Sequence, residues 1–421
     1  MSGLPSRRLR DQPSGASSAQ PPAVVSGGVG HPGAPGQFGV HGVQEKRDWP
    51  PLTEAEVASV LAHYPALPPV AAILWHSMRP FSAAGIVQMQ GASPKTVVVK
   101  RHHAQLRSVA ALEAEHAFMR HLGARGLPVS TVLRTDGGAG SGASALTQGQ
   151  WTYEVFLPAQ GEDLYRETMS WQPYQSLDHA RVAGAELARL HKAAEGFEAP
   201  ARGEACPLVS SMVAVGQQDF LPALRAWAVR QPGLAQQLAG RAWEQDVQAA
   251  LGPFHAVLRP LLGAVKPCWG HGDWHGSNLL WAPGPAAGIR SVLDFGMADR
   301  TCAVFDLAVA LERSGVMWLD LTGPDVVVYP QIQALLEGYQ NARPLSAAER
   351  ALLVAFLPLV HVEFALSEVA YFGTLLKDAA SAEVAYTEYL LGHARWFAGD
   401  EGRALLDWLP AALARGPAAA S

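Results

Sequence analysis

The stretch from Gly270 to Asp306 constrains the fold more than any other part of the chain. It reads GHGDWHGSNLLWAPGPAAGIRSVLDFGMADRTCAVFD. Asp273 comes five residues before Asn278, and Asp294 follows an apolar pair and precedes a Phe-Gly pair. The apolar residues before Asp294 indicate a short strand between two loops. The pattern therefore predicts a fold in which a loop, a strand and a second loop bring one amide and two carboxylates together.

These three polar side chains are the set that phosphoryl transfer to an alcohol requires. One carboxylate takes the proton of the acceptor hydroxyl, while an asparagine oxygen and a second carboxylate hold magnesium against the phosphates of a nucleotide. We therefore expect Asp273 to be the base, and Asn278 and Asp294 to be the ligands of Mg²⁺.

Composition narrows the class of protein. A chain of 421 residues can bury a large core and, at about 150 residues per domain, is expected to form two or three units. Its 32 basic and 37 acidic residues give a formal net charge of −5, and the basic residues are scattered, so we expect no nucleic-acid partner. Three cysteines without close spacing favour neither a disulfide framework nor a zinc site. A cytoplasmic protein is expected.

Membrane insertion is not expected either. The longest notable apolar run, Leu352 to Val360, contains a proline and stops well short of the roughly 18 residues that a membrane span needs. Residues 1–48 contain 9 Gly, 6 Pro and 6 Ser and are predicted to be a disordered tail.

The next part of the chain, residues 49–157, is predicted to be a small lobe that binds the nucleotide. Thr53 and Glu56 have the spacing of a capping box at the start of a helix. Two β-rich runs, Gly85 to Met89 and Thr96 to Lys100, are separated by a loop with Gly and Pro, which predicts an antiparallel hairpin. Arg79 to Gly85 is either a loop that covers the phosphates or an ordinary turn.

A helix is predicted from Ser108 to Leu122, with Glu115 on its apolar side. A carboxylate there needs a cation, and Lys100 at the end of the preceding strand is the candidate. A strand lysine paired with a helix glutamate is the arrangement that holds an ammonium group against nucleotide phosphates. The alternative is that Glu115 is a solvated helix charge.

Residues 158–421 are predicted to form a larger, mainly helical lobe that holds the catalytic stretch and the acceptor pocket. The amphipathic segment Asp178 to Ala194 ends close to His191, which is expected to be a packed or capping histidine. Three carboxylates, Glu312, Glu363 and Glu368, lie among apolar neighbours in predicted helices. They are either packing residues or contacts to an acceptor that carries an amine.

The segment His271 to Leu280 resembles the HGDxHxxNLL catalytic loop of the aminoglycoside phosphotransferase and choline kinase-like enzymes. Val292 to Gly296, followed by Asp306-Leu307-Ala308, resembles the metal-binding segment of the same family. The resemblance implies an α+β, bilobal protein-kinase-like fold, with a small antiparallel sheet and one helix in the N-lobe and a larger helical C-lobe. It also implies transfer of the γ-phosphate of ATP, or GTP, to the hydroxyl of a small molecule.

The resemblance also implies roles for individual residues. Asp273 would be the base, Lys100 the contact to the α- and β-phosphates and Glu115 its partner, while His271 and Asp306 would brace the catalytic loop. Magnesium would be the cofactor, held by Asn278 and Asp294. The resemblance specifies neither the acceptor nor the oligomeric state.

Three other interpretations were weighed. A metal-dependent hydrolase could use His271, Asp273 and His275 as ligands, because imidazole and carboxylate groups bind zinc. A kinase-like binding protein without catalysis would lack one of the key groups, but all of them are present. A protein serine or threonine as acceptor is disfavoured, because only twelve residues separate Asp294 from Asp306 and leave little platform for a peptide.

Overall fold

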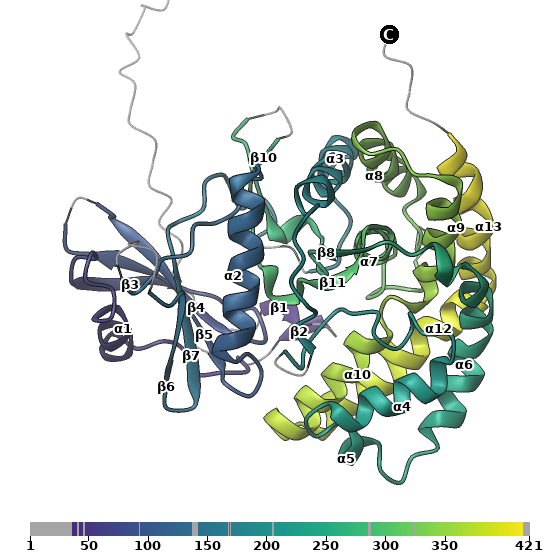
Figure 1. The fold of residues 1–421 in the computed structure, drawn as a ribbon, viewed down its shortest axis with the longest axis horizontal. Helices are drawn as coiled ribbons and strands as arrows, with labels where there is room; N and C mark the ends of the chain where they lie inside the picture. Colours follow the sequence, from purple (N-terminus) through teal and green to yellow (C-terminus); the bar gives the residue numbers. More distant parts are fainter. Residues whose placement is uncertain are drawn as a thin grey trace, which may run out of the picture.

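The structure is a computed structural model that describes residues 36–39, 42–44, 47–91, 93–136, 142–166, 168, 170–203, 206–284, 288–323 and 325–415. Figure 1 shows two lobes, one built around an antiparallel sheet and the other built mainly from helices. The predicted α+β, bilobal architecture is therefore confirmed.

The strands are short and fall mostly in the first half of the chain. They are β1 Gly36–Gly39, β2 Gly42–Gln44, β3 Val70–His76, β4 Ala83–Met89, β5 Thr96–His103, β6 Ala145–Gln148, β7 Trp151–Phe156, β8 Pro267–Gly270, β9 Leu279–Trp281, β10 Ile289–Val292 and β11 Asp299–Cys302.

The helices occupy most of the second half. They are α1 Glu54–Leu61, α2 Val109–Ala124, α3 Leu177–Ala193, α4 Phe220–Arg230, α5 Leu234–Leu238, α6 Trp243–Leu258, α7 Ala303–Gly315, α8 Tyr329–Ala342, α9 Ala347–Phe356, α10 Val362–Ala370, α11 Ala379–Val384, α12 Leu391–Ala398 and α13 Asp400–Ala414.

The N-lobe is a five-stranded antiparallel sheet with the strand order β3-β4-β5-β7-β6. Alternate residues of β5 point to opposite faces, so Val97 and Val99 are fully buried against α1 while Lys100 faces the other way. The capping box of Thr53 and Glu56 starts α1, as predicted. The hairpin of β4 and β5 is also confirmed, whereas β3 was not predicted.

Helix α2 joins the N-lobe to the C-lobe. Ser108 caps its first turn, because its hydroxyl accepts a hydrogen bond from the backbone N–H of Ala111. The buried side chain of Phe118 contacts Trp269 and Phe295, with ring centroids 5.3 and 6.0 Å apart. Helix α2 of the N-lobe thus fixes Phe295, the residue before Gly296, in the C-lobe.

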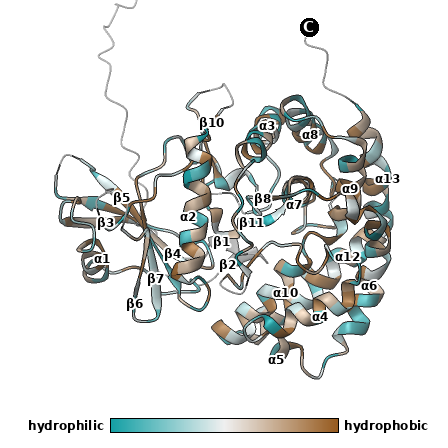
Figure 2. Ribbon diagram, viewed as in Figure 1, coloured by the Kyte–Doolittle hydropathy of each residue, from teal (hydrophilic) through white to brown (hydrophobic). Residues whose placement is uncertain are grey.

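Two small hairpins in the C-lobe carry the catalytic stretch. β8 pairs with β11, and β9 pairs with β10, both in antiparallel register. Helix α7 follows β11 directly and is buried along its whole length, from Ala303 to Gly315. Figure 2 shows hydrophobic and hydrophilic residues alternating around the C-lobe helices, as expected for helices that each bury one face.

Helices α3 and α8 approach each other closely through two glycines. A Cβ atom at Gly184 would overlap the carbonyl oxygen of Leu335, and one at Gly338 would overlap that of Arg181. Only a residue without a side chain allows the two backbones this close.

Replacing Gly338 with alanine is expected to lower the free energy of unfolding by about 1–3 kcal/mol, because the added methyl group forces the two helices apart. Gly263→Ala is the matched control, since a Cβ atom there meets nothing within 4 Å. Chemical denaturation of both variants measures the difference. Equal midpoints for the two would show that the close approach does not limit stability.

Two stretches lack continuous regular structure. Residues 234–258 form two helices, α5 and α6, and not one, because the chain turns at Gly240, whose φ of +81° is left-handed. The run from Thr131 to Leu133 forms no strand in the described residues; Val132 makes an isolated bridge to Phe156.

The helical stretch Ala347–Leu376 is 30 residues long and is apolar enough to cross a membrane by length and composition alone. However, 94% of its most apolar window is buried inside the protein. It packs as a core helix of this fold. Its apolar character is therefore explained by the neighbouring helices.

Within the segment expected to be a tail, β1 and β2 pair with each other, and residues 1–35, 40, 41, 45 and 46 lie outside the described residues. Asp48, at the end of this segment, connects the two lobes. Its Oδ2 atom accepts hydrogen bonds from the backbone N–H of Phe81 at 3.0 Å and from the hydroxyl of Tyr371 at 2.7 Å.

Candidate active site

The catalytic loop starts where β8 ends, and Asp306 holds its backbone. The two carboxylate oxygens of Asp306 accept hydrogen bonds from the backbone N–H groups of His271 and Gly272, both at 2.7 Å. Asp306 lies in the first turn of α7, so the helix and the loop are fixed to each other. The side chain of His271 donates from Nε2 to the carbonyl oxygen of Leu293 at 2.8 Å. These are the contacts expected of residues that brace a loop.

A histidine and a tyrosine complete the surroundings of Asp306. His191 Nε2 lies 2.9 Å from Asp306 Oδ2, and its Nδ1 lies 2.7 Å from the hydroxyl of Tyr339. Burial by itself would raise the pKa of Asp306, but the hydrogen bonds and charges around it lower the pKa below its ordinary value. His191 is a buried, packed residue, as the sequence indicated.

Asp273 is held from two sides. Its Oδ1 atom lies 2.9 Å from Nε of Arg313, and its Oδ2 atom accepts a hydrogen bond from the amide of Asn278 at 3.1 Å. The same amide donates to the backbone carbonyl of Asp273 at 2.9 Å, which closes the loop between the two residues. Burial opposes ionisation, but the positive charge of Arg313 holds the pKa of Asp273 far below its usual range. The carboxylate is therefore charged at neutral pH.

The hairpin of β9 and β10 brings Asp294 beside Asn278. Leu279 pairs with Val292, and the backbone N–H of Leu293 donates to the carbonyl oxygen of Asn278 at 2.8 Å. Asp294 is the next residue along the chain, and its left-handed backbone, with φ of +52°, turns it out of the hairpin. Its side chain is 48% exposed. The second carboxylate is thus open to a ligand.

Lys100 reaches from the N-lobe to this carboxylate. Its Nζ atom donates to Asp294 Oδ1 at 2.9 Å, which joins the sheet of one lobe to the segment of the other lobe that carries Asp294. Burial by itself would lower the pKa of Lys100, but Asp294, Glu154 and Glu115 raise it above its ordinary value. Lys100 therefore carries a full positive charge at the position expected for a contact to nucleotide phosphates.

The predicted ion pair between Lys100 and Glu115 does not form in this structure. Glu115 is buried on α2, as its place on the apolar side indicated, but its Oε2 atom lies 3.2 Å from Arg202. Arg202 also donates to the carbonyl oxygen of Gly296 at 2.5 Å. Glu115 therefore supports the segment that follows Asp294, and acts on Lys100 only through its charge.

The donor atoms of Asn278 and Asp294 suit magnesium. Both side chains offer oxygen, which is the ligand that Mg²⁺ prefers, and Mg²⁺ is commonly held by one or two carboxylates together with substrate phosphates. Across the described part of the chain, no three or more His, Cys, Asp and Glu side chains gather in a way that could hold a metal. In the hydrolase interpretation His271, Asp273 and His275 would bind zinc, but Nε2 of His271 donates to the carbonyl oxygen of Leu293 and Nε2 of His275 lies 3.1 Å from the amide of Asn278.

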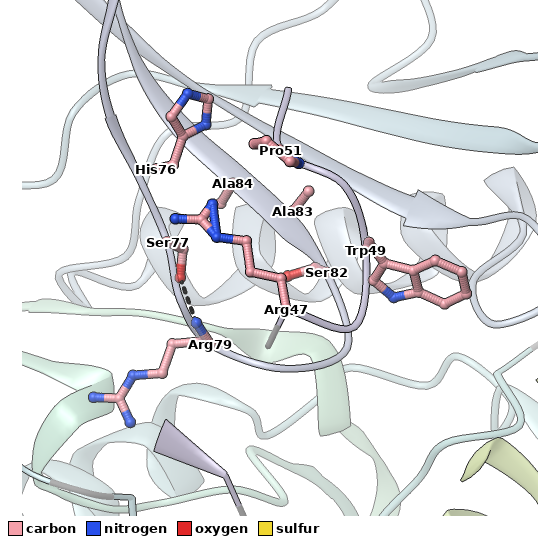
Figure 3. Close-up of a pocket in the computed structure, with 9 residues that line it drawn as sticks. All are labelled: Arg47, Trp49, Pro51, His76, Ser77, Arg79, Ser82, Ala83 and Ala84. Atoms are coloured by element: carbon pink, nitrogen blue, oxygen red, sulfur yellow. Dashed lines mark hydrogen bonds between the residues drawn. The ribbon is translucent and has the colours of Figure 1, made fainter. Parts of the chain in front are cut away.

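The loop between β3 and β4 crosses to the C-lobe. Arg79 donates to the hydroxyl of Ser170 at 2.6 Å, and Phe81 packs edge-on against Tyr371 with centroids 5.1 Å apart. Figure 3 shows Arg79 pointing away from the small hollow that Arg47 and His76 line. Arg79 and Ser82 of the loop also line this hollow, and none of the predicted catalytic, nucleotide-binding or metal-binding residues does. The loop is therefore more than a simple hairpin turn.

Sequence analysis missed two buried arginines that hold the site, Arg313 and Arg202. A signal existed for Arg313, because it follows Asp306 by seven residues in a mainly apolar helix that also contains Glu312, and seven residues are two helical turns. No comparable signal marks Arg202, which lies in a stretch without regular structure.

The three carboxylates singled out in the C-terminal half are all buried. Glu363 accepts hydrogen bonds from the backbone N–H groups of Ala214 and Val215 at 2.7 and 3.2 Å, so it is a packing residue. Glu312 lies 3.0 Å from His393. Among the residues that the structure describes, neither carboxylate oxygen of Glu368 has a hydrogen-bond partner, and this residue is fully buried.

The two lobes, the lysine that joins them and the pair of loops define a phosphotransferase of the protein-kinase-like type. The chain belongs to the phosphotransferase enzyme family, whose sequence pattern it matches over residues 86–345. It is therefore a phosphotransferase with an alcohol group as acceptor.

Related proteins carry several names. A homoserine kinase of Acidiphilium cryptum is 28% identical over 252 residues, which cover 60% of this chain and 67% of that protein. The serine/threonine protein kinase RdoA of Salmonella typhimurium is 24% identical over 281 residues, or 64% of this chain and 69% of that protein.

Solved structures show the same fold. A microcompartment-associated aminopropanol kinase superposes with a TM-score of 0.53 at 17% identity, over 86% of this chain and 99% of that chain. The amicoumacin kinase hAmiN, solved with AMP-PNP and Ca²⁺, has a TM-score of 0.50 at 14% identity, over 80% of this chain and 96% of that chain.

Proposed function

We propose that this protein transfers the γ-phosphate of ATP, or GTP, to the hydroxyl of a small molecule, with Asp273 as base. Asn278 and Asp294 would hold Mg²⁺, which supplies charge stabilisation for the phosphates. Lys100 contacts the α- and β-phosphates. We also propose a cytoplasmic location, where ATP is made available to such enzymes.

The reaction balances with the groups present. The acceptor oxygen forms a bond to the γ-phosphorus while the bond between that phosphorus and the bridging oxygen of ADP breaks. The hydroxyl proton passes to Asp273 and then to solvent. Because Asp273 is a weak base, proton transfer is expected late, after much of the bond to ADP has broken, which suits a loose transition state.

One observation carries this proposal. The bond from Lys100 to Asp294, at 2.9 Å, joins the two lobes and meets the hairpin that places Asn278 beside Asp294. An ammonium group, an amide and a carboxylate thus converge on one point, with Asp273 bonded to that amide. No other reaction class considered uses all four groups.

Glu368 indicates which kind of acceptor fits. A buried carboxylate without a partner is costly, and a ligand that pairs with it removes the cost. Burial raises the pKa of Glu368 well above its ordinary value; the positive charge of Arg313 opposes that rise, and the charges of Asp48 and Asp273 add to it. An alcohol that carries an ammonium group can pair with Glu368 while its hydroxyl reaches Asp273. The names of two similar proteins, a homoserine kinase and an aminopropanol kinase, point to acceptors of this kind.

Matched pairs of acceptors test the amine. Aminopropanol is compared with propanediol, and homoserine with the hydroxybutanoate that lacks its amine, by measuring ADP formation with Mg-ATP. In at least one pair, turnover is expected with the alcohol that carries the amine and not with the alcohol that lacks it. Glu368→Gln is expected to raise KM for that amine by about 10- to 100-fold, the size of a lost hydrogen bond to a charged group.

The control for this variant is Glu388→Gln, which changes an exposed glutamate in the same part of the chain. If the amine-free partners react equally well, the amine proposal fails and the phosphotransferase proposal stands. If the enzyme consumes no ATP with any alcohol in a broad panel, the proposed function itself fails.

A further inference from the structure

Helix α7 holds the catalytic loop at two points. Asp306 in its first turn binds the backbone of the loop, and Arg313, two turns later on the same side, meets the carboxylate of Asp273 at 2.9 Å. The same rigid element therefore positions both the main chain and the side chain of the residue expected to act as base.

Arg313 is itself fixed in place. Its residue exposure is 2%. The guanidinium lies over the ring of Trp171 with its carbon 4.4 Å from the centroid, and over Phe364 at 5.0 Å. Two aromatic faces that attract a cation hold the plane of the guanidinium, so it has little freedom to rotate.

The orientation of Asp273 follows from this arrangement. One oxygen faces Arg313 and the other faces the amide of Asn278 at 3.1 Å. A carboxylate held by both oxygens cannot turn about its bond to the chain. Without Arg313, one oxygen would be released and a partly buried negative charge would lose its nearest counter-charge.

We propose that Arg313 is a positioning residue for phosphoryl transfer, fixing the Asp273 carboxylate in the orientation in which it receives the proton of the acceptor. The inference rests on the proposed function, because it assigns Asp273 the role of base. Arg313 acts through Asp273 and is not placed in contact with the nucleotide, whose proposed contacts are Lys100, Asn278 and Asp294.

Arg313→Lys and Arg313→Met test the proposal. Affinity for Mg-AMP-PNP is measured by calorimetry, and turnover by formation of ADP from ATP with water or aminopropanol as acceptor. We expect Arg313→Met to bind the nucleotide within about 2-fold of the wild type and to lose turnover by about 10²-fold, the loss that a displacement of about 1 Å can cause. Arg313→Lys keeps the charge without the planar group, so its turnover is expected to fall between those of the wild type and Arg313→Met.

Arg241→Met is the matched control. Arg241 also pairs with a carboxylate, Glu383, at 2.5 Å and lies over an aromatic ring, Tyr386, at 4.7 Å, but it shares no partner with the catalytic loop. This control is expected to keep full turnover. A crystal structure of Arg313→Met provides a second measurement, in which Asp273 is expected to have rotated away from Asn278.

The outcomes separate the two proposals. Full turnover in Arg313→Met, or an unmoved Asp273 in its crystal structure, would overturn the positioning role while leaving Asp273 as the base. If Arg313→Met fails to fold, Arg313→Lys and chemical rescue of Arg313→Ala by free guanidinium decide the question, because a structural role alone gives no recovery of turnover. Full turnover in Asp273→Ala would instead overturn the proposed function.

Discussion

Replacing Asp273 with alanine is expected to lower the rate of phosphoryl transfer by about 10²- to 10⁴-fold, the range typical of a positioned general base. The variant removes the group that takes the proton of the acceptor and leaves Arg313 without its counter-charge. Nucleotide binding is expected to persist, because Lys100, Asn278 and Asp294 are unchanged. Calorimetry with Mg-AMP-PNP and steady-state turnover measure the two effects separately.

The control for this variant is Asp178→Ala. The side chain of Asp178 is 78% exposed and pairs with Arg181 on the surface of α3. Turnover in this control is expected to match the wild type. Asp273→Ala with unchanged turnover would remove Asp273 from the mechanism, whatever its place in the structure.

Asp294→Ala is expected to abolish the magnesium-dependent part of nucleotide binding. The carboxylate is one of the two proposed protein ligands, and it is also the hydrogen-bonded partner of Lys100 at 2.9 Å. Its removal takes away a metal ligand and sets free a positive charge that attracts phosphates. Loss of the ligand weakens ATP binding only when magnesium is present, whereas the freed charge of Lys100 strengthens ATP binding even without magnesium.

This difference gives a sharp measurement. In the wild type, ATP is expected to bind more tightly with Mg²⁺ than with a chelator present. In Asp294→Ala, affinity is expected to be the same under both conditions, and the affinity measured with chelator is expected to equal or exceed that of the wild type. Retention of the magnesium effect in the variant would show that Asp294 is not a ligand of the metal.

Local patterns predicted the elements that carry the site. The strand before Asp294, the turn that holds Asn278 and the strand that carries Lys100 each depend on a few neighbouring residues, and their patterns indicated them. The last of these strands continues to His103, so Lys100 does not end it as predicted. The convergence of these groups was predicted from the order of polar residues in one short stretch. Their chemical roles remain predictions for the variants described above.

Contacts between distant segments were harder to predict. Glu115 was correctly placed on the buried side of α2, but its partner is Arg202, 87 residues further along the chain. Spacing within a helix shows which face a residue occupies, and it does not show which distant cation lies against that face. Lys100 pairs with Asp294 instead, with its Nζ atom 2.9 Å from Oδ1 of that carboxylate.

Arg313 was missed for a different reason. A charged residue near the end of a helix is usually solvated, and α7 is exceptional because it is buried on every side. Its burial depends on helices that come later in the chain, which surround it only in the folded protein (Figure 1). The seven-residue interval from Asp306 was visible, but its meaning depended on that burial.

The close crossing of α3 and α8 ties the scaffold to catalysis. Tyr339 follows Gly338 directly, and His191 lies two turns along α3 from Gly184, so the helix crossing sets the distance between the hydroxyl and the imidazole that support Asp306. A bulkier residue at the crossing would widen that distance at temperatures below those at which the lobe unfolds. Enzymes altered there should lose turnover at temperatures where their circular dichroism is still native, so a damaged scaffold would be mistaken for a damaged catalytic group.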